Sequence, residues 1–353
     1  MPLMAKRLPV TVITGFLGAG KTTVLRHLLT QSGQRLAVMV NEFGTVGLDG
    51  DLIRSCGFCP DEEVEGRLVE LNNGCLCCTV QDDFLPTMET LLQRSDQLDG
   101  IVVETSGLAL PRPLLQALEW PAIRRRVHVN GVVTVVDGEA LSGGSPVGDP
   151  EALERQRQED QSLDHLTAIE DLFEDQLEAA DLVLISRSDR LQPSQLNSVL
   201  EGIQPRLRPG AGTLAISQGQ VDPALVLGLE SSESTHRADQ AENAGDHDHD
   251  HSHVEAISGQ IRLEGSFDRS SLEQLLPEFA RTHHVIRLKG RVWLPGKSLP
   301  LQIQMVGPRL DSWFEAAPEQ AWTPPAGAGL ELVVIGLEAG AAERLETRLV
   351  AKR

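Results

Sequence analysis

The chain has 353 residues, a length typical of about two domains with separate hydrophobic cores. Its formal net charge is −20 at pH 7, aromatic residues make up 3% of it, and tyrosine is absent. A general nucleic-acid binder would need basic patches or aromatic stacking surfaces, so this composition argues against one. No apolar stretch is long enough to cross a membrane. We therefore expect neither nucleic-acid nor membrane partners.

Residues 15–22 match the phosphate-binding P-loop, in which glycines precede a lysine and a threonine. The flanks agree, because the β-branched run Val10–Thr14 predicts a buried parallel strand and residues 23–29 predict a helix. The glycines allow backbone amides to face phosphates, Lys21 supplies a positive charge, and the Thr22 hydroxyl can bind Mg²⁺. The predicted phosphate-binding residues are Gly15, Gly18, Ala19, Gly20, Lys21, Thr22 and Thr23.

Apolar runs and helical patterns alternate after this loop, as expected for a parallel sheet with crossover helices. Strands are predicted at 36–40, 101–105, 132–137 and 181–185, and helices at 84–94, 113–119 and 169–179. We therefore predict an α/β fold with a doubly wound, mainly parallel sheet over residues 1–229. Its ligand should bind at the carboxyl ends of the strands.

The composition changes at residue 230. Residues 230–255 are polar and rich in His and Asp, which predicts a disordered linker. Strands at 257–267, 285–294, 299–306 and 330–337 and helices at 270–282 and 341–349 then predict a smaller α+β C-terminal domain over residues 256–353. The linker histidines are either part of a solvated tether or weak accessory metal ligands; they are His247, His249, His251 and His253.

A P-loop enzyme needs a carboxylate near Mg²⁺ and a backbone amide for the γ-phosphate. Residues 103–107 end an apolar strand and offer both, although the E-x-x-G pattern also occurs by chance. Glu104 can orient a metal-bound water, and Gly107 can donate its N–H to the γ-phosphate and move when that phosphate leaves. The predicted catalytic residues are Lys21, Thr22, Glu104 and Gly107.

Ser186–Asp189 lies where GTPases carry the turn that recognises guanine. Asp189 can accept hydrogen bonds from the base, and Arg187 can stack over it. Serine at 186 replaces the usual asparagine, so an ordinary turn at the end of a strand is the alternative interpretation.

All five cysteines lie between residues 56 and 78. Nothing at the N-terminus resembles a signal peptide, so we expect a cytoplasmic protein whose clustered thiols serve metal binding or catalysis. Cys75, Cys77 and Cys78 form a Cys-x-Cys-Cys segment that can bind one Zn²⁺, Co²⁺ or Cu⁺. A buried structural cluster and a zinc ribbon that includes Cys56 and Cys59 are alternatives; the latter pair alone could also be redox-active.

The chain resembles the CobW family of metal-handling P-loop GTPases. The resemblance rests on the P-loop, on Asn73–Thr79 with its three cysteines, and on Glu104–Pro111, with further similarity at 40–44, 174–177, 180–181 and 287–296. It implies a GTPase that uses Mg²⁺ and binds one metal ion as cargo at Cys75, Cys77 and Cys78. It also implies that residues 42–51 form the switch, with Glu42 and Asp49 among the nucleotide-binding residues.

The motifs are most similar to the cobalamin-biosynthesis branch of the family. That branch implies Co²⁺ as cargo and a cobalt chelatase as client, with Zn²⁺ and a zinc enzyme close behind, because thiolates alone do not separate the two metals. The leading hypothesis is a GTP-hydrolysing metallochaperone. A zinc-storage protein regulated by GTP and an assembly factor with a structural zinc ribbon are the rivals.

Overall fold

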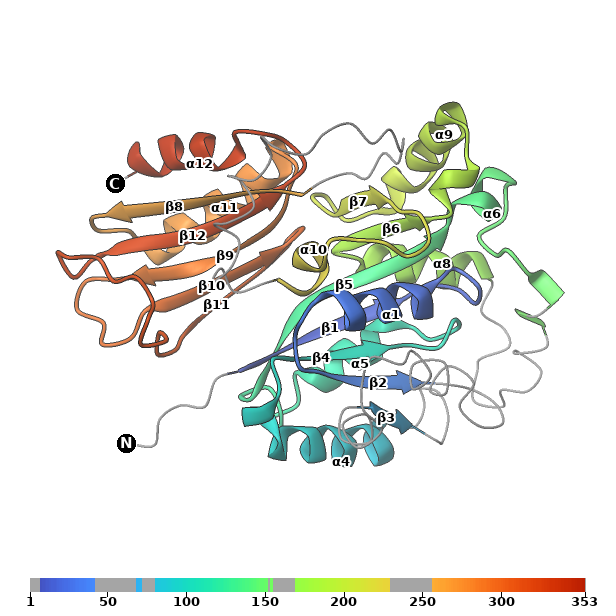
Figure 1. Cartoon of the computed structure of the whole chain (residues 1–353), viewed down its shortest axis with the longest axis horizontal. Helices are drawn as coiled ribbons and strands as arrows, with labels where there is room; N and C mark the ends of the chain where they lie inside the picture. The colour runs from blue at the N-terminus through green and yellow to red at the C-terminus, as the bar shows by residue number, and fades with distance from the viewer. Residues whose placement is uncertain are drawn as a thin grey trace, which may run out of the picture.

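A computed structural model describes residues 7–41, 68–71, 80–151, 153–154, 169–228 and 256–352, with the backbone alone at 40–41, 68–71 and 80–83. The N-terminal part holds a seven-stranded sheet in the order β3-β2-β4-β1-β5-β6-β7, and every pair of neighbours is parallel (Figure 1). The strands are β1 Leu8–Thr14, β2 Leu36–Asn41, β3 Leu68–Leu71, β4 Gly100–Glu104, β5 Val127–Asp137, β6 Leu182–Ser186 and β7 Gly212–Ala215.

Helices cover both faces of this sheet. Successive residues of a strand point to opposite faces, so neighbouring residues of β1 pack against different helices. Ile13 of β1 packs in the cluster that holds α1 and α10, whereas its neighbour Val12 packs with α4 and α5. A further cluster joins α8 and α9 to β6. The α-helices are α1 Lys21–Gln31, α4 Val80–Gln93, α5 Pro111–Leu118, α6 Gly138–Ser142, α8 Ile169–Ala179, α9 Pro193–Ile203 and α10 Pro223–Leu227, and the 3₁₀ helices are η1 Ser95–Gln97, η2 Ser188–Arg190 and η3 Gln204–Arg206.

The C-terminal part is a five-stranded antiparallel sheet in the order β11-β10-β9-β12-β8. Both of its helices contribute to one apolar cluster with the sheet. Its elements are β8 Ile257–Glu264, α11 Arg269–Thr282, β9 Val285–Trp293, β10 Leu301–Val306, β11 Arg309–Phe314, β12 Gly329–Gly336 and α12 Ala341–Val350. The predicted fold class, a doubly wound parallel sheet followed by a smaller α+β domain, is therefore confirmed.

Several elements of the described structure were not predicted, namely the strands β3, β7 and β11, the helices α6, α9 and α10, and the three 3₁₀ helices. Strand β5 begins five residues before the predicted start at Val132. The predicted linker 230–255 lies outside the described residues. The predicted domain limits remain predictions.

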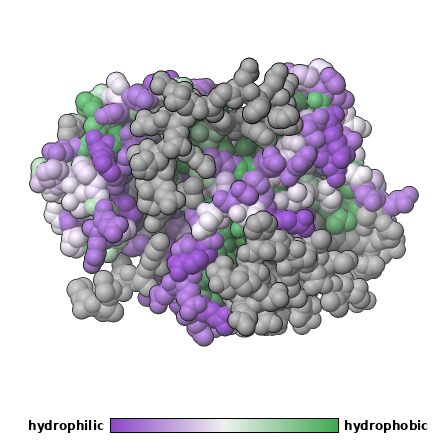
Figure 2. Space-filling view, in the orientation of Figure 1, coloured by the Kyte–Doolittle hydropathy of each residue, from purple (hydrophilic) through white to green (hydrophobic). Residues whose placement is uncertain are grey.

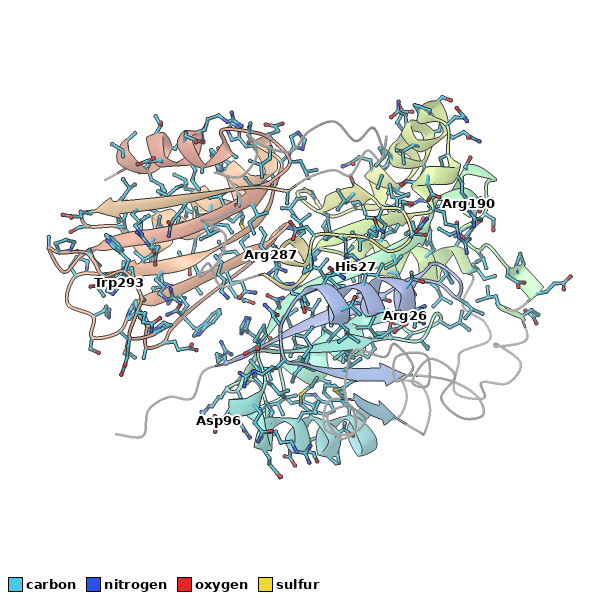
Figure 3. The ribbon with its side chains drawn as sticks, in the orientation of Figure 1. Arg26, His27, Asp96, Arg190, Arg287 and Trp293 are labelled. Carbon is cyan, nitrogen blue, oxygen red and sulfur yellow. The ribbon has the colours of Figure 1, made fainter. Side chains whose placement is uncertain are left out.

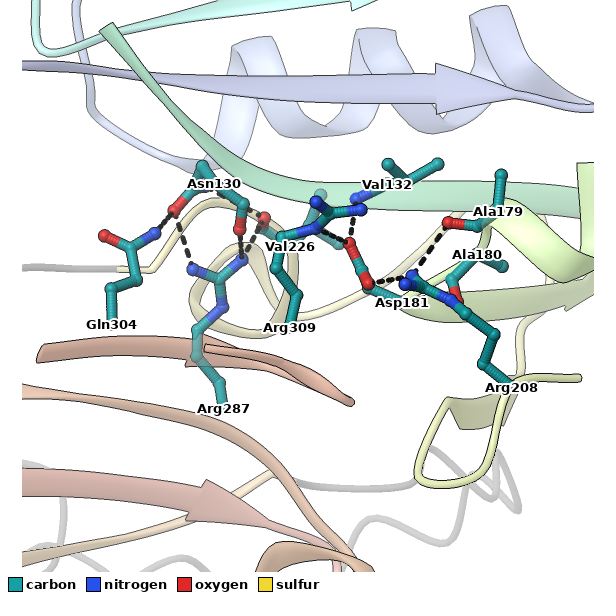
Figure 4. Close-up of polar contacts among 10 residues, drawn as sticks. All are labelled: Asn130, Val132, Ala179, Ala180, Asp181, Arg208, Val226, Arg287, Gln304 and Arg309. Carbon is teal, nitrogen blue, oxygen red and sulfur yellow. Dashed lines mark hydrogen bonds and ion pairs between the residues drawn. The ribbon is translucent and has the colours of Figure 1, made fainter. Parts of the chain in front are cut away.

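The two sheets meet at a buried polar interface, here called the domain seam and defined by Asn130, Asp181, Arg287, Gln304 and Arg309 (Figure 4). Figure 3 shows Arg287 at the boundary between the two parts. The seam lies along the amino-terminal half of β5 and the start of β6, away from the ends of the strands that carry the predicted ligand site.

Arg287 of β9 is 1% exposed and makes four hydrogen bonds to the N-terminal part. Its guanidinium donates to Asn130 Oδ1 at 2.9 Å, to the Asn130 carbonyl at 3.1 Å and to the Val226 carbonyl at 2.7 Å, and its Nε donates to the Leu225 carbonyl at 3.1 Å. Burial lowers the pKa of Arg287 to about 9. The side chain therefore stays charged at neutral pH, and the four oxygens replace its lost hydration.

Asp181 precedes β6 and is fully buried. One carboxylate oxygen pairs with Arg208, and the other accepts from Arg309 Nε at 2.7 Å and from the Val132 N–H at 2.8 Å. One buried carboxylate thus connects three parts of the chain: β5, the segment that precedes β7, and strand β11 of the C-terminal sheet.

Few large apolar side chains face solvent. Among the described residues only Ile257 and Val350 are exposed large hydrophobics. The described surface over α9 is mainly hydrophilic in the view of Figure 2. Within the described chain, no helix combines the length and the apolar character that a membrane span requires.

Candidate functional site

The predicted P-loop connects β1 to α1 at the carboxyl edge of the parallel sheet. Gly15, Gly18 and Gly20 have φ angles of 135°, 74° and 101°, which L-residues with side chains rarely adopt. A Cβ on Gly15 would lie 2.1 Å from the Val135 carbonyl oxygen, so the loop also passes too close to β5 for a side chain. No side chain caps α1 at Gly20. The amides of its first turn are thus arranged for an anionic ligand.

Lys21 begins α1 and is 8% exposed. Its Nζ donates to the Phe16 carbonyl at 3.1 Å, which holds the ammonium group across the loop. Phe16 itself is buried, and its ring lies 5.9 Å from that of Phe173 in α8. The predicted phosphate-binding lysine is therefore positioned by a loop that is anchored in the core.

Thr22 and Glu104 meet, as their predicted roles require. The Thr22 hydroxyl donates to Glu104 Oε1 at 3.0 Å, and Glu104 is 3% exposed at the end of β4. Glu104 lies beside Ile13 of β1, so the sheet brings the carboxylate to the P-loop. Hard oxygen donors of this kind are the ligands that Mg²⁺ prefers, and the pair fits that ion.

The loop after β4 contacts the P-loop through Gly107. A Cβ at this position would lie 2.5 Å from the Leu17 backbone nitrogen, so only glycine fits. Gln176 of α8 is fully buried, and its Nε2 donates to the Gly107 carbonyl at 3.1 Å and to the Ala109 carbonyl at 3.3 Å. The predicted γ-phosphate-sensing loop thus lies against the P-loop and is bonded to α8.

The predicted base-recognition turn lies beside the same loop. Arg187 has a φ angle of 55°, its Nη1 pairs with Asp137 at the end of β5, and its Nη2 donates to the Gly18 carbonyl at 3.1 Å. Asp189 follows in η2 and is exposed. The stacking of Arg187 on a base and the contact of Asp189 with it remain predictions.

Two residues of the site were missed by sequence reasoning. Asp137 ends a predicted strand and was given no role, although a carboxylate at a carboxyl edge is a signal for a site. Gln176 lies in the predicted helix 169–179 and in the segment 174–177 that contributes to the family resemblance, but it was given no role of its own. Its partners, Gly107 and Ala109, are more than sixty residues away, so nothing local reveals the contact.

Other predicted site residues lie outside the described residues. They are Glu42, Asp49, Cys56, Cys59, Cys75, Cys77, Cys78, His247, His249, His251 and His253. Their roles remain predictions.

Comparison with known proteins identifies the family. The model of the CobW/HypB/UreG nucleotide-binding domain matches residues 9–215, and that of the cobalamin synthesis protein cobW C-terminal domain matches residues 256–351. The chain belongs to the CobW/HypB/UreG family. It is a P-loop GTPase, and the family is one of GTPase metallochaperones, in agreement with the sequence resemblance.

Two curated relatives are similar over nearly their whole length. A protein named zinc chaperone CobW from Pseudomonas aeruginosa is 42% identical over 99% of this chain and 93% of its own. A protein of the same name from Sinorhizobium is 42% identical over 94% and 93%. Among solved structures, the Zn(II)-bound YjiA GTPase from Escherichia coli covers 99% of both chains at 21% identity, with a TM-score of 0.39.

Proposed function

We propose that this GTPase carries one Zn²⁺ on Cys75, Cys77 and Cys78 and transfers it to a client protein under control of the nucleotide. GTP raises the affinity for the metal, and hydrolysis to GDP lowers it. The client then takes the ion from the lower-affinity state. Such a switch needs the metal segment and the γ-phosphate to bias the same loops.

The strand register at the carboxyl edge is the observation that carries this proposal. Asn41 of β2 lies beside Leu71 of β3, and Val40 of β2 lies beside Glu104 of β4. The predicted switch begins directly after Asn41, and Cys75 follows Leu71 by four residues. Three adjacent strands therefore lead into the switch, the cysteine segment and the carboxylate that contacts Thr22.

Each nucleotide-site residue then has a role. Lys21 would neutralise charge on the β- and γ-phosphates, and the amides of the P-loop would bind the same oxygens. Thr22 and Glu104 would hold Mg²⁺, which when bound supplies further positive charge for the phosphates. Gly107 would donate its N–H to the γ-phosphate. Because Gly107 contacts Leu17, loss of the γ-phosphate would change the conformation of the P-loop and of the loop after β4 together.

We also propose that Arg187 and Asp189 bind guanine. Their turn begins where β6 ends, and Arg187 reaches the Gly18 carbonyl of the P-loop, so the base would lie beside the phosphates. Asp189 is exposed and lies in η2, outside the sheet, so its carboxylate is accessible to accept hydrogen bonds from a base.

Zinc is proposed as the cargo because full-length relatives at 42% identity carry the name zinc chaperone. Cobalt, which the sequence resemblance favoured, remains the alternative, since thiolates bind both ions. The client follows the metal, being a zinc enzyme in the first case and a cobalt chelatase in the second.

The test is competition for metal against a chromophoric chelator. Zn²⁺ and Co²⁺ are titrated separately into reduced protein loaded with Mg²⁺ and either GDP or a non-hydrolysable GTP analogue. We expect the GTP analogue to raise Zn²⁺ affinity by roughly 5- to 150-fold, the usual range of coupling between sites. Cys77→Ser should remove this difference and leave nucleotide affinity unchanged.

Equal Zn²⁺ affinities in the two nucleotide states would refute the switch and favour storage or structural zinc. A larger difference for Co²⁺ than for Zn²⁺ would refute zinc as the cargo and support cobalt.

A further inference from the structure

Arg187 joins the predicted base-recognition turn both to Asp137 at the end of β5 and to the P-loop. Arg187 Nη1 binds Asp137 Oδ2, and Nη2 donates to the Gly18 carbonyl at 3.1 Å. Two nitrogens of one planar guanidinium are thus bound to two different segments, the end of β5 and the P-loop. Because the group is rigid and planar, these two bonds fix the direction in which its face points.

Asp137 is well suited to hold that plane. It is 2% exposed at the end of β5, and its Oδ1 accepts the Ala140 N–H at 3.1 Å, which caps the short helix α6. The carboxylate is therefore fixed by the sheet on one side and by a helix cap on the other. A Cβ on Gly148 would lie 2.7 Å from Asp137 Oδ2, so the loop that covers the pair passes close to it.

We propose that Asp137 is a positioning residue for nucleotide binding, which acts through Arg187. It sets the plane of the guanidinium over the base site and, through Nη2, holds the Gly18 carbonyl in the P-loop. The inference rests on the proposed place of Arg187 in the guanine site. It extends that proposal to a residue at the end of β5, fifty positions earlier in the chain.

A neighbouring ion pair serves as a matched control. Glu139 Oε2 lies 2.9 Å from Arg190 Nη1, and this pair also links α6 to η2 (Arg190 is labelled in Figure 3). Its side chains are 50% and 60% exposed, and no contact joins them to the P-loop in the described structure. Glu139→Gln therefore tests whether the loss of an ion pair between α6 and η2 is by itself enough to weaken nucleotide binding.

The experiment compares Asp137→Asn, Glu139→Gln, Arg187→Gln and the double variant Asp137→Asn/Arg187→Gln. Asparagine keeps an oxygen for the α6 cap, but it removes the charge and replaces the oxygen that accepts from Arg187 with an NH2 group. For each variant, the measurements are the Kd of Mg²⁺–GDP, the KM and kcat for GTP, the ratio of GTP to ATP affinity, and the midpoint of thermal unfolding.

We expect Asp137→Asn to raise both the KM for GTP and the Kd of Mg²⁺–GDP about 10-fold, and to lower the ratio of GTP affinity to ATP affinity. The kcat at saturating GTP and the midpoint of thermal unfolding should change little. Glu139→Gln should match the unmodified protein. The double variant should bind nucleotide as tightly as Arg187→Gln alone, because Asp137 acts through Arg187.

Two outcomes would overturn the inference. One is an unchanged KM in Asp137→Asn when Arg187→Gln raises it. The other is a rise in the KM for GTP in Glu139→Gln that equals the rise in Asp137→Asn. Failure of the underlying proposal is distinct, since Arg187→Gln itself would then retain the nucleotide affinity and base preference of the unmodified protein.

Discussion

Strand β1 leads into the P-loop at its carboxyl end, and β4 and β5 end at Glu104 and Asp137 beside it. The amino-terminal half of β5 and the start of β6 instead lie against the C-terminal sheet. Charged groups lie at both ends of these strands. At the carboxyl edge they stand beside glycines with positive φ angles and beside an exposed turn. At the domain seam, Arg287 and Asp181 are almost completely buried, and protein atoms provide all the partners described above.

This difference separates charge that serves a ligand from charge that serves the fold. A buried charge is tolerated only where fixed partners replace its hydration, and the seam provides them. The carboxyl edge instead has backbone that only glycine can form and amides without side-chain caps, which is the arrangement a phosphate requires. Substitutions at the edge should therefore change turnover, and substitutions at the seam should change stability.

The largest expected effect is at the carboxyl edge. Lys21→Ala removes the charge that we propose faces the phosphates, and we expect GTP turnover to fall about 1,000-fold while the unfolding midpoint stays within a few degrees. Turnover by phosphate release and thermal unfolding by circular dichroism are the measurements. Hydrolysis at the unmodified rate would contradict the P-loop assignment.

At the seam, Asp181→Asn should act on stability alone. The amide cannot replace both carboxylate oxygens, so Arg208 or Arg309 loses its carboxylate partner, and we expect the free energy of unfolding to fall by about 3 kcal/mol. Asp99→Asn is the control, because its pair with Arg35 is exposed and screened by solvent, so this substitution should lower stability much less than Asp181→Asn does. Denaturant unfolding measures both. If Asp181→Asn instead lowered GTP affinity with stability unchanged, the proposed separation between the two ends would be wrong.

A smaller effect concerns pH. His128 donates through Nε2 to Gln304 Oε1 at 2.8 Å, and its ring lies 4.6 Å from that of Trp313. Burial lowers the pKa of His128 to about 3, from an ordinary value of 6.5. The folded protein thus holds this ring neutral between these values, while the unfolded chain binds a proton there. Stability from His128 is complete above pH 6.5 and is lost as the pH falls toward 3.

Between pH 7 and pH 5 this linkage should remove about 2 kcal/mol of stability. His128→Gln cannot titrate, so its free energy of unfolding should fall by about 2 kcal/mol less over the same interval. Urea unfolding at the two pH values gives both numbers. Parallel losses in the two proteins would show that His128 is not neutral in the fold.

The edge was more predictable from sequence than the seam for a physical reason. The P-loop, Glu104 and the Ser186–Asp189 turn are local patterns whose residues act where their strands end. The seam depends on partners far apart in the chain. His128 and Asn130 interrupt the apolar pattern of β5, so the strand was predicted to begin at Val132, and their partner Gln304 lies more than 170 residues later.

The missed elements have similar explanations. Helix α9 starts with a capping box formed by Gln192 and Gln195, which is a weaker sequence signal than a serine or aspartate cap. Strand β11 is an edge strand whose residues are all half-buried, so it lacks the alternation that identifies a strand. The Asp137–Arg187 pair joins the end of β5 to the turn after β6, two positions fifty residues apart, so no local pattern indicates the contact.

If the nucleotide at the carboxyl edge controls metal affinity, linkage requires the metal to change the relative affinities for the two nucleotides by the same factor. The ratio of affinities for a non-hydrolysable GTP analogue and for GDP is measured in metal-free protein and in protein saturated with Zn²⁺. We expect Zn²⁺ to raise this ratio by the same factor by which the GTP analogue raises Zn²⁺ affinity, and to leave it unchanged in Cys77→Ser. A ratio that Zn²⁺ does not alter in the unmodified protein would contradict the account.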